Sequence, residues 1–481
     1  MSPLVYLALF GWIPVTFQLF QRFPATNAVA LSVVFATLFL PQSGIALPVI
    51  PDYSKIAATS YAVLLVTCVR ESARLSRFQP GWVDIPVAIW CLCPFVTSMV
   101  NGLGPYDGFT AMLEQMIAWG APYFLGRLYL GSLNGLRQLA IAILYGGLVY
   151  VPLCLLETRI SPQLHRMVYG FHAHSDFSQT MRAGGYRPMV FMSHGLALAG
   201  YMLAATLIAI WLWRSGSLKE IRKVKMHWIV VILVVTFILL KSSGALFLLI
   251  AGVAVMLTAR WLRTGILLLV LVAAIIGYLQ MGVAGTFTVE NVDRVTEITT
   301  QIAGEERAAS LRFRLDNEQI LGERARERVV FGWGGWGRNR VFNDYGEDIS
   351  VTDSLWILAF GINGAVGLVS LFSTLLLPPV TFLLLRYPAR TWFKPQVAPA
   401  AALSVVLVLY SIDCVLNAMT NPVFTLAAGG LAGLVLNGDR TPLPKQALPN
   451  AKATVKQPLP ASPRRRALAA AQRKATSVCN D

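Results

Sequence analysis

The stretch SLWILAFGINGAVGLVSLFSTLLLPPVTFLLL, residues 354–385, has no charged side chain from end to end. A helix that spans a membrane needs about 20 consecutive apolar residues. Backbone groups within lipid must also form their hydrogen bonds inside their own segment, which favours a helix over irregular structure. We therefore interpret residues 354–385 as a membrane-spanning helix.

Twelve further runs are similarly poor in charge, and together with this one they predict thirteen crossings. The whole chain of 481 residues is 56% hydrophobic and 13% charged, whereas soluble domains have about 25% charged residues. We expect an all-α polytopic membrane protein with about 12–14 transmembrane helices. The other runs are 4–20, 27–47, 55–69, 82–100, 109–126, 137–156, 188–213, 228–241, 244–260, 265–284, 398–416 and 422–437.

The formal net charge of +16 is explained by the positions of the basic residues. Loops on the inner side of a membrane carry an excess of Lys and Arg. Alternate short loops hold 16 basic residues, and the intervening short loops hold 6. This bias predicts an outer N-terminus and an inner C-terminus, and it makes a nucleic-acid partner unnecessary.

Three segments interrupt the apolar pattern and give the predicted organisation. Residues 157–187 form an outer loop, and 285–352 form a larger outer loop with nine arginines and twelve acids. The basic, proline- and alanine-rich tail 438–481 cannot bury a core, so we expect it to be disordered on the inner side. The membrane parts are the N-terminal helices of 1–156, the central helices of 188–284 and the C-terminal helices of 353–437.

The large outer loop contains an expected amphipathic helix. In SLRFRLDNEQILGERARERVVFGWGGWGRNR, residues 310–340, apolar residues recur at nearly helical spacing between charged ones. The glycines from Gly332 to Gly337 should end this helix. Trp333 and Trp336 could then anchor the turn at the lipid interface.

Arginines in the outer segments are the strongest candidates for ligand binding. A guanidinium group stays charged and binds phosphate oxygens in a bidentate manner, which suits a pyrophosphate at the lipid surface. Alternatively, each arginine pairs with a loop acid or reaches into the headgroups. The candidates are Arg182, Arg187, Arg312, Arg314 and Arg338.

Candidates for proton transfer are His194 and Asp353. His194 could carry a proton or only bond a neighbouring backbone group. Asp353 could be a base or the N-cap of the following helix. Glu114 and Asp413 lie inside predicted spans, where ionisable groups are costly and often functional. With Lys241 they would serve a transporter.

Several other chemistries lack their motifs. The sequence has no phosphate-binding G-x-x-x-x-G-K-[ST] loop, no zinc-type His/Cys spacing and no D-x-D pair. Six cysteines are scattered without the pattern of a disulfide framework. We therefore expect an enzyme, if this is one, to work without metal or cofactor on a substrate within the membrane.

The order of motifs over residues 180–385 resembles the O-antigen ligase and O-antigen polymerase superfamily of bacterial membrane proteins. The resemblance rests on RAGGYRPMVFMSHG before a span, on Arg314 ahead of FGWGGWG, and on TDSLWILAFGINGAVGLVSLF. That family usually has a histidine where this chain has Asp353. Because a carboxylate is ordinarily a weaker base than imidazole, this departure leaves the base or the product in question.

The resemblance implies metal-independent, inverting transfer of a glycan from polyprenyl pyrophosphate to a hydroxyl acceptor, on the periplasmic face of the inner membrane. Arg187 and Arg314 would hold the pyrophosphate and Arg182 would assist. The expected partners are the polyprenyl-pyrophosphate-linked glycan, membrane lipid, and polysaccharide assembly or export proteins. Two alternatives stay open: a transporter of an anionic solute or polysaccharide, and a non-catalytic subunit of polysaccharide export.

Overall fold

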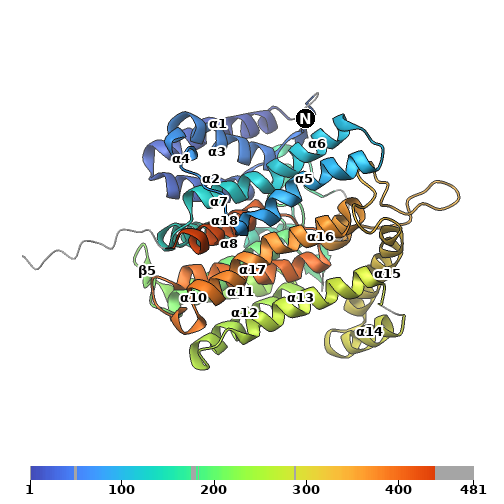
Figure 1. Cartoon of the computed structure of the whole chain (residues 1–481). Helices are drawn as coiled ribbons and strands as arrows, with labels where there is room; N and C mark the ends of the chain where they lie inside the picture. The colour runs from blue at the N-terminus through green and yellow to red at the C-terminus, as the bar shows by residue number, and fades with distance from the viewer. Residues whose placement is uncertain (1, 48–50, 175–179, 183, 287–288, 439–481) are drawn as a thin grey trace, which may run out of the picture. The chain divides into compact units, whose positions relative to one another are not determined.

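A computed structural model describes residues 2–47, 51–174, 180–182, 184–286 and 289–438. The predicted tail 438–481 lies outside the described residues except for Gly438. The described chain is mostly helical, and its only strands are six strands of two residues each, paired in three antiparallel hairpins (Figure 1). The fold class is therefore all-α, as the sequence predicts.

Eight helical segments of the described chain are long and apolar enough to cross a membrane. Three further apolar helices are shorter, with 10–17 residues. The long segments are or contain α1 (Pro3–Arg22), α5 (Ile85–Val100), α8 (Leu133–Ile160), α10 (Gly195–Arg214), α12 (Ser243–Trp261), α13 (Ile266–Ala284), α16 (Leu355–Thr381) and α17 (Ala398–Leu416); the shorter ones are α2 (Ala25–Phe39), α11 (Met226–Leu239) and α18 (Pro422–Asn437).

The two remaining predicted spans are also helical, although they fall below these limits. One is α3 (Lys55–Arg70). The other is divided into α6 (Pro105–Gln115), the π-helical turn η2 (Met116–Gly120) and α7 (Ala121–Tyr129). A total of 12–14 crossings thus stays a prediction.

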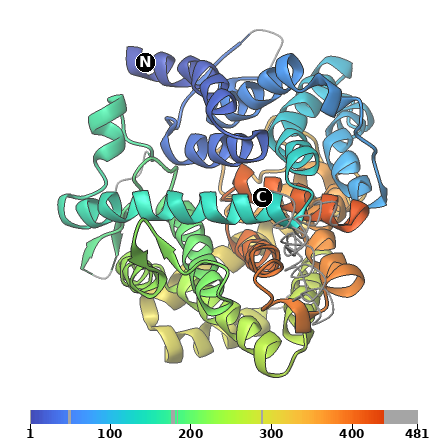
Figure 2. The same cartoon turned by 90° about the vertical axis from the view of Figure 1, so that its left-hand side faces the viewer.

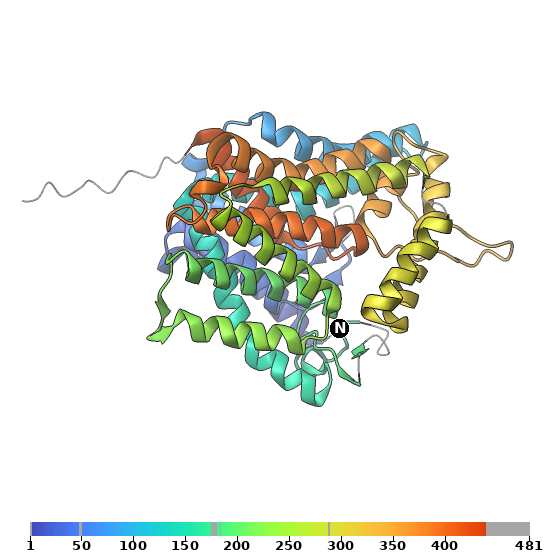
Figure 3. The ribbon, with the colours of Figure 1, turned by 90° about the horizontal axis from the view of Figure 1, so that it is seen from below.

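The ends of the bundle are distinct. The N-terminus and the helix pair α14 (Val289–Ala303) and α15 (Glu305–Arg326) lie at one end, and the hairpin of β5 (Glu220–Ile221) and β6 (Val224–Lys225) lies at the other (Figures 1 and 3). We call the first of these the outer end, following the charge pattern. Viewed along the bundle, α8 lies across its neighbours at a steep angle and contacts α2, α10 and α17 (Figure 2).

Among the eight long segments, α10 and α17 are the most buried, and they pack against each other. Their small residues, such as the alanines at 400–402 and 204–205, are fully buried. Close contact between small residues is the usual way in which membrane helices associate. These two helices therefore form a fixed frame on which outer-end residues can be held.

Two predicted helix boundaries were wrong, and one helix was not predicted. The span predicted from residue 188 begins as a helix only at Gly195, because residues 187–194 form a loop. The span predicted to reach residue 47 ends at Phe39, and β1 (Gly44–Ile45) follows. The sequence analysis also missed α14, although Val295, Ile298 and Ile302 recur at helical spacing along it.

Arg127, one of the 16 basic residues counted above in the inner loops because it follows the predicted span 109–126, is buried on α7. Its guanidinium group binds Asp84 in a bidentate manner, with Nε to Oδ1 at 2.7 Å and Nη2 to Oδ2 at 3.0 Å. Only 2% of the Arg127 side chain is exposed. It is therefore a structural ion pair and not a headgroup contact.

A glycine-rich turn interlocks with a break in α16. Gly364 has φ 65°, and the helix is non-helical there. Four backbone N–H groups compensate: Trp333 donates to Gly361, Gly334 to Ile362, Ala365 to Val329 and Val366 to Val330. The segment predicted as a simple turn after the amphipathic helix thus satisfies the backbone groups that the break exposes.

Candidate functional site

The loop before α10 is held by one buried carboxylate. Glu157, at the end of α8, is fully buried and accepts hydrogen bonds from three backbone N–H groups. These come from Leu164 at 3.0 Å, Met189 at 2.8 Å and Val190 at 2.7 Å. The loop conformation that places Arg187 is therefore fixed from α8.

Arg187 follows the hairpin of β3 (Met181–Arg182) and β4 (Gly185–Tyr186), and only 5% of the residue is exposed. Its Nη2 donates to Ser242 Oγ at 3.1 Å. The stem of its side chain lies against Gly195, where an added Cβ would come within 2.7 Å of Arg187 Cδ. Only glycine leaves room for the arginine at this position.

Arg314 comes from a different outer segment, the helix α15, which covers part of the predicted helical stretch 310–340. Its Nη1 donates to Asn417 Oδ1 at 3.1 Å and reaches the Leu416 carbonyl oxygen at 3.5 Å. Its Nε lies 3.7 Å from Asp353 Oδ2. Arg314 thus joins α15 to the ends of α16 and α17.

Asp413 lies near the outer end of α17, close enough to both arginines to feel their charges. The positive charges of Arg314 and Arg187 both favour the ionised form of its carboxylate. Asp413 Oδ1 also accepts a hydrogen bond from Asn417 Nδ2 at 2.7 Å, and Gly200 of α10 lies beside Oδ2. We call Arg187, Arg314, Asp413 and Asn417 the outer arginine cluster.

Asp353 lies at the edge of this cluster, with 41% of its side chain exposed. The interpretation of Asp353 as an N-cap was wrong, because Ser354 is the N-cap of α16. Asp353 instead pairs with Arg314. Its carboxylate is close to a guanidinium group and accessible from solvent, as a base would need to be.

His194 is the N-cap of α10, and its Nδ1 accepts a hydrogen bond from the Leu196 N–H at 3.0 Å. The ring also packs edge-on against His174, with centroids 5.2 Å apart. Because Nδ1 is occupied as an acceptor, only Nε2 could exchange a proton with a substrate. This geometry favours a structural role for His194.

The other predicted arginines lie apart from the cluster. Arg312 pairs with Asp293 on α14 at 3.0 Å and lies 3.9 Å from Asp316. Arg338 donates to the Asn101 carbonyl oxygen at 3.3 Å, beyond the far end of α15. Arg182 lies in β3, and its side chain is outside the described structure.

Trp333 is partly buried and packs against two arginines, and its anchoring at the lipid interface stays a prediction. The guanidinium carbons of Arg324 and Arg328 lie 3.5 and 4.5 Å from its ring centroid. Its indole Nε1 donates to the Arg324 carbonyl oxygen at 2.7 Å. Trp336, by contrast, is 80% exposed.

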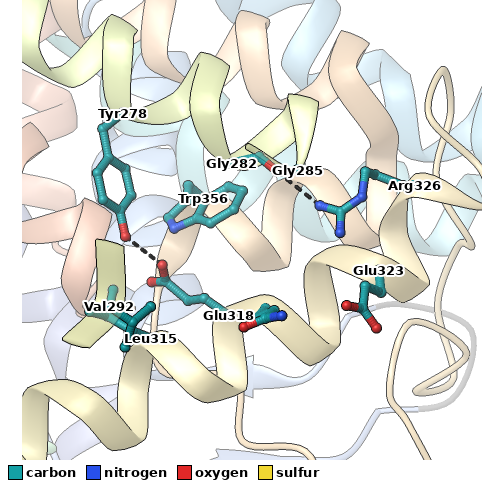
Figure 4. A pocket seen from close by; sticks show the side chains of 10 residues that line it. Tyr278, Gly282, Gly285, Val292, Leu315, Glu318, Glu323, Arg326 and Trp356 are labelled. Atoms are coloured by element: carbon teal, nitrogen blue, oxygen red, sulfur yellow. Dashed lines mark hydrogen bonds between the residues drawn. The ribbon is translucent and has the colours of Figure 1, made fainter. Parts of the chain in front are cut away.

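A small cavity of about 60 Å³ lies between α13, α15 and α16 (Figure 4). There Glu318 Oε2 accepts a hydrogen bond from Tyr278 Oη at 2.5 Å, and Arg326 Nη1 donates to the Gly282 carbonyl oxygen at 3.1 Å. Burial raises the pKa of Glu318, although the nearby charge of Arg314 opposes this. These contacts seat α15 on the membrane helices.

The residues set aside for a transporter do not share one environment. Glu114 is exposed on α6 and interacts electrostatically with Asp52. Lys241 lies beside Gly185 in the β3–β4 hairpin, and Asp413 belongs to the outer arginine cluster. Among the described residues, no group of three His, Cys, Asp or Glu side chains could hold a metal ion.

Sequence reasoning did not find the residues that connect the two arginines. Asp413 stood out as an acid within a span, but nothing in the sequence linked it to Arg187 or Arg314. Asn417 and Ser242 carried no signal, because single polar residues at helix ends are common. The arrangement depends on which helix ends meet in space, and spacing along the chain does not reveal this.

The fold and cluster define an all-α membrane protein with paired arginines and carboxylates at one end of its bundle. No protein-family model matches the sequence, and no curated protein matches it.

Proposed function

We propose that this protein is a membrane-embedded glycosyltransferase. It would move a glycan from a polyprenyl-pyrophosphate carrier to a hydroxyl acceptor at the outer face of a bacterial inner membrane. The product would be a surface polysaccharide, made by polymerisation or by ligation. The proposal is carried by one geometric link: Arg314 donates to Asn417, which donates to Asp413 of α17, and the charge of the buried Arg187 also reaches the Asp413 carboxylate.

The charges of the cluster suit a diphosphate. Arg187 and Arg314 contribute two positive charges, and Lys241, outside the cluster but next in the chain to the Arg187 partner Ser242, adds a third nearby. Asp413 and Asp353 contribute two negative ones. Asp353 is the more exposed partner of Arg314 and binds it at a long 3.7 Å, so an incoming phosphate could replace it.

The proposed reaction needs no redox step. The acceptor hydroxyl oxygen would form a bond to the anomeric carbon as the bond from that carbon to the pyrophosphate oxygen breaks. The bonding electron pair would leave with the pyrophosphate, whose growing negative charge the guanidinium groups would stabilise. The hydroxyl proton would pass to Asp353, released from Arg314 by the bound phosphate.

The experiment compares Arg187→Ala and Arg314→Ala in cells whose chromosomal copy is deleted. Loss of either guanidinium group should lower surface polysaccharide at least tenfold at equal protein level, because fixed charges that meet a developing negative charge are worth roughly a hundredfold in rate. Arg294→Ala is the matched control, since Arg294 is exposed on α14 outside the cluster. Normal polysaccharide from both cluster variants would refute the proposal.

Lipid-linked intermediates separate the two kinds of transferase. Full-length lipid-linked chains should accumulate if the protein is a ligase, and single repeat units if it is a polymerase. Accumulation of neither, together with loss of solute uptake or export, would favour a transporter. The break in α16 is the observation that speaks for that alternative, because interrupted helices are common at transport sites.

A further inference from the structure

A second polar cavity lies on the other side of the turn between α17 and α18. Its volume is about 430 Å³, and its lining residues come from the regions where three helices start and from the hairpin of β1 and β2 (Tyr53–Ser54). Its walls are rich in hydroxyl and amide groups, from Thr37, Gln42, Ser43, Thr59, Ser193 and Asn421. Thr37 and Thr59 donate to carbonyl oxygens of their own helices, but each hydroxyl oxygen can still accept a hydrogen bond from a hydroxyl-bearing ligand.

Lys55 gives this cavity its charge. The residue is 8% exposed and lines the cavity at the first position of α3. In the described part of the chain its ammonium group has one hydrogen bond, to the Phe191 carbonyl oxygen at 3.0 Å. That oxygen also accepts from Gln42 Nε2 at 2.9 Å, so neutral groups alone hold the charge in place.

The helix ends around the cavity add to the positive potential. The chain enters α3 at Lys55 and α18 at Pro422, which both line the cavity, and it enters α10 at Gly195, two positions from the lining residues Ser193 and Ala197. Each helix N-terminus carries about half a positive charge. No Asp or Glu is among the described lining residues; Asp52 lies behind Gly44 with its side chain exposed.

A buried ammonium group without a counter-ion is costly, because several kcal/mol of hydration are lost on burial. An anion in the cavity would stabilise the charged form of Lys55 and lie close to the start of α3. The cavity reaches the surface at Ser193 and Thr420, which are both exposed. A ligand therefore has an entrance from the outer end of the bundle.

We propose that the Lys55 cavity is a binding site for the phosphate or carboxylate group of a hydroxyl-rich molecule. The inference goes beyond the proposed glycosyl transfer and does not depend on it. The turn Asn417–Asn421 separates the cavity from the outer arginine cluster, since Asn417 faces Arg314 and Asn421 lines the cavity. In a transferase, a molecule bound there would stand next to the donor as the acceptor.

The test measures binding to the purified full-length protein in detergent. Inorganic phosphate, D-glucuronate and neutral D-glucose are titrated at constant ionic strength, followed by calorimetry. At least one anion should bind tenfold or more tightly than glucose, and whichever binds identifies a phosphate or a carboxylate source. Absence of binding by both anions would overturn the proposal.

Variants assign the signal to this cavity. Lys55→Met should weaken anion binding at least tenfold, Lys55→Arg should keep it within about threefold, and Lys225→Met, in an exposed inner hairpin, should leave it unchanged. Ser193→Trp should block the entrance without touching the buried lysine, which keeps the test valid if Lys55→Met fails to fold. Unchanged binding in Ser193→Trp would contradict the proposal.

Arg314→Ala separates this inference from the proposed function. Phosphate bound by the outer arginine cluster should be lost in Arg314→Ala and kept in Lys55→Met. The cavity signal should show the opposite pattern. A signal that disappears only in Arg314→Ala would refute the Lys55 site while leaving the transferase proposal standing.

Discussion

At the residue scale, Glu157 connects three backbone N–H groups that lie up to 33 positions away in the chain. In the described structure, the Glu157 carboxylate is the only side-chain group that accepts a hydrogen bond from each of these N–H groups. A buried donor left without its acceptor costs about 1–3 kcal/mol. Glu157 therefore contributes both to stability and to the placement of Arg187.

We expect Glu157→Ala to lower the free energy of unfolding by on the order of 3 kcal/mol or more, because three buried donors would lose their acceptor. Glu157→Gln should lose less, since its amide oxygen can still accept hydrogen bonds. Thermal unfolding of the purified variants in detergent measures the difference. Glu220→Ala on exposed β5 is the control; equal midpoints for Glu157→Ala and the control would contradict this role.

Glu318 gives a second prediction at this scale, in pH dependence. Burial raises its pKa in the folded protein, so the folded state binds its proton more tightly than the unfolded state does. The stability it contributes is present below the unfolded pKa and is lost as pH rises through the folded pKa. The thermal unfolding midpoint should therefore decrease as the pH is raised from the pKa of Glu318 in the unfolded state to its higher pKa in the folded state.

The matched variant is Glu318→Gln, which cannot titrate and keeps a group that can bond Tyr278. Its unfolding midpoint should change less with pH than that of the natural protein across this interval. Parallel pH curves for the two proteins would show that Glu318 does not titrate differently on folding.

The residue scale also shows what the sequence could and could not predict about the site. Arg187 and Arg314 were singled out because guanidinium groups in the outer segments suit a pyrophosphate, and both belong to the cluster. Arg312 was chosen for the same reason, yet it lies two positions from Arg314 on a helix and therefore points to another face, toward Asp293. To distinguish Arg314 from Arg312, one must know which face of α15 points toward α16 and α17, and the sequence does not give this.

At the element scale, the broken helix α16 and the glycine-rich turn depend on each other. Gly364 has φ 65°, and an added Cβ would stand 2.3 Å from the Val330 carbonyl oxygen. Gly332 has φ 66°, with its added Cβ 2.5 Å from Ile362. Side chains other than glycine are strained at positive φ by about 1–2 kcal/mol even without such contacts.

We predict that Gly364→Ala and Gly332→Ala each lower the free energy of unfolding by about 2 kcal/mol or more, through strain and overlap together. The control is Gly277→Ala on α13, where φ is helical and no atom lies within 4 Å of the added Cβ. That change should be neutral or should stabilise by up to about 1 kcal/mol. If all three midpoints shift alike, the interlocking of turn and break is wrong.

The apolar spans could be predicted from hydropathy, whereas the start of α10 and the break in α16 could not. Every predicted span falls on a helix because lipid leaves an apolar segment few other structures. The start of α10 was misplaced because residues 188–192 are apolar yet belong to a loop, which Glu157 fixes from outside. The break at Gly364 was equally hidden, since its hydrogen-bonding partners are in a separate segment of the chain.

At the scale of the whole described bundle, the positions of the basic loops predict how the bundle is oriented across the membrane. The loops with the excess of basic residues include the turn after α12 and the β5–β6 hairpin, whereas α14 and α15 lie at the other end (Figures 1 and 3). Positive loops stay on the inner side. Both proposed binding sites would then face outward, where a translocated lipid-linked glycan would be found.

Cysteine labelling tests this orientation with two exposed positions. Tyr345, 90% exposed beyond α15, and Leu262, 70% exposed at the turn after α12, are replaced singly by cysteine in a Cys68→Ser, Cys479→Ser background. A membrane-impermeant maleimide should label Tyr345→Cys in intact spheroplasts and Leu262→Cys only after permeabilisation. The opposite pattern would place the outer arginine cluster and the Lys55 cavity on the cytoplasmic side, where neither could meet a substrate already carried across the membrane.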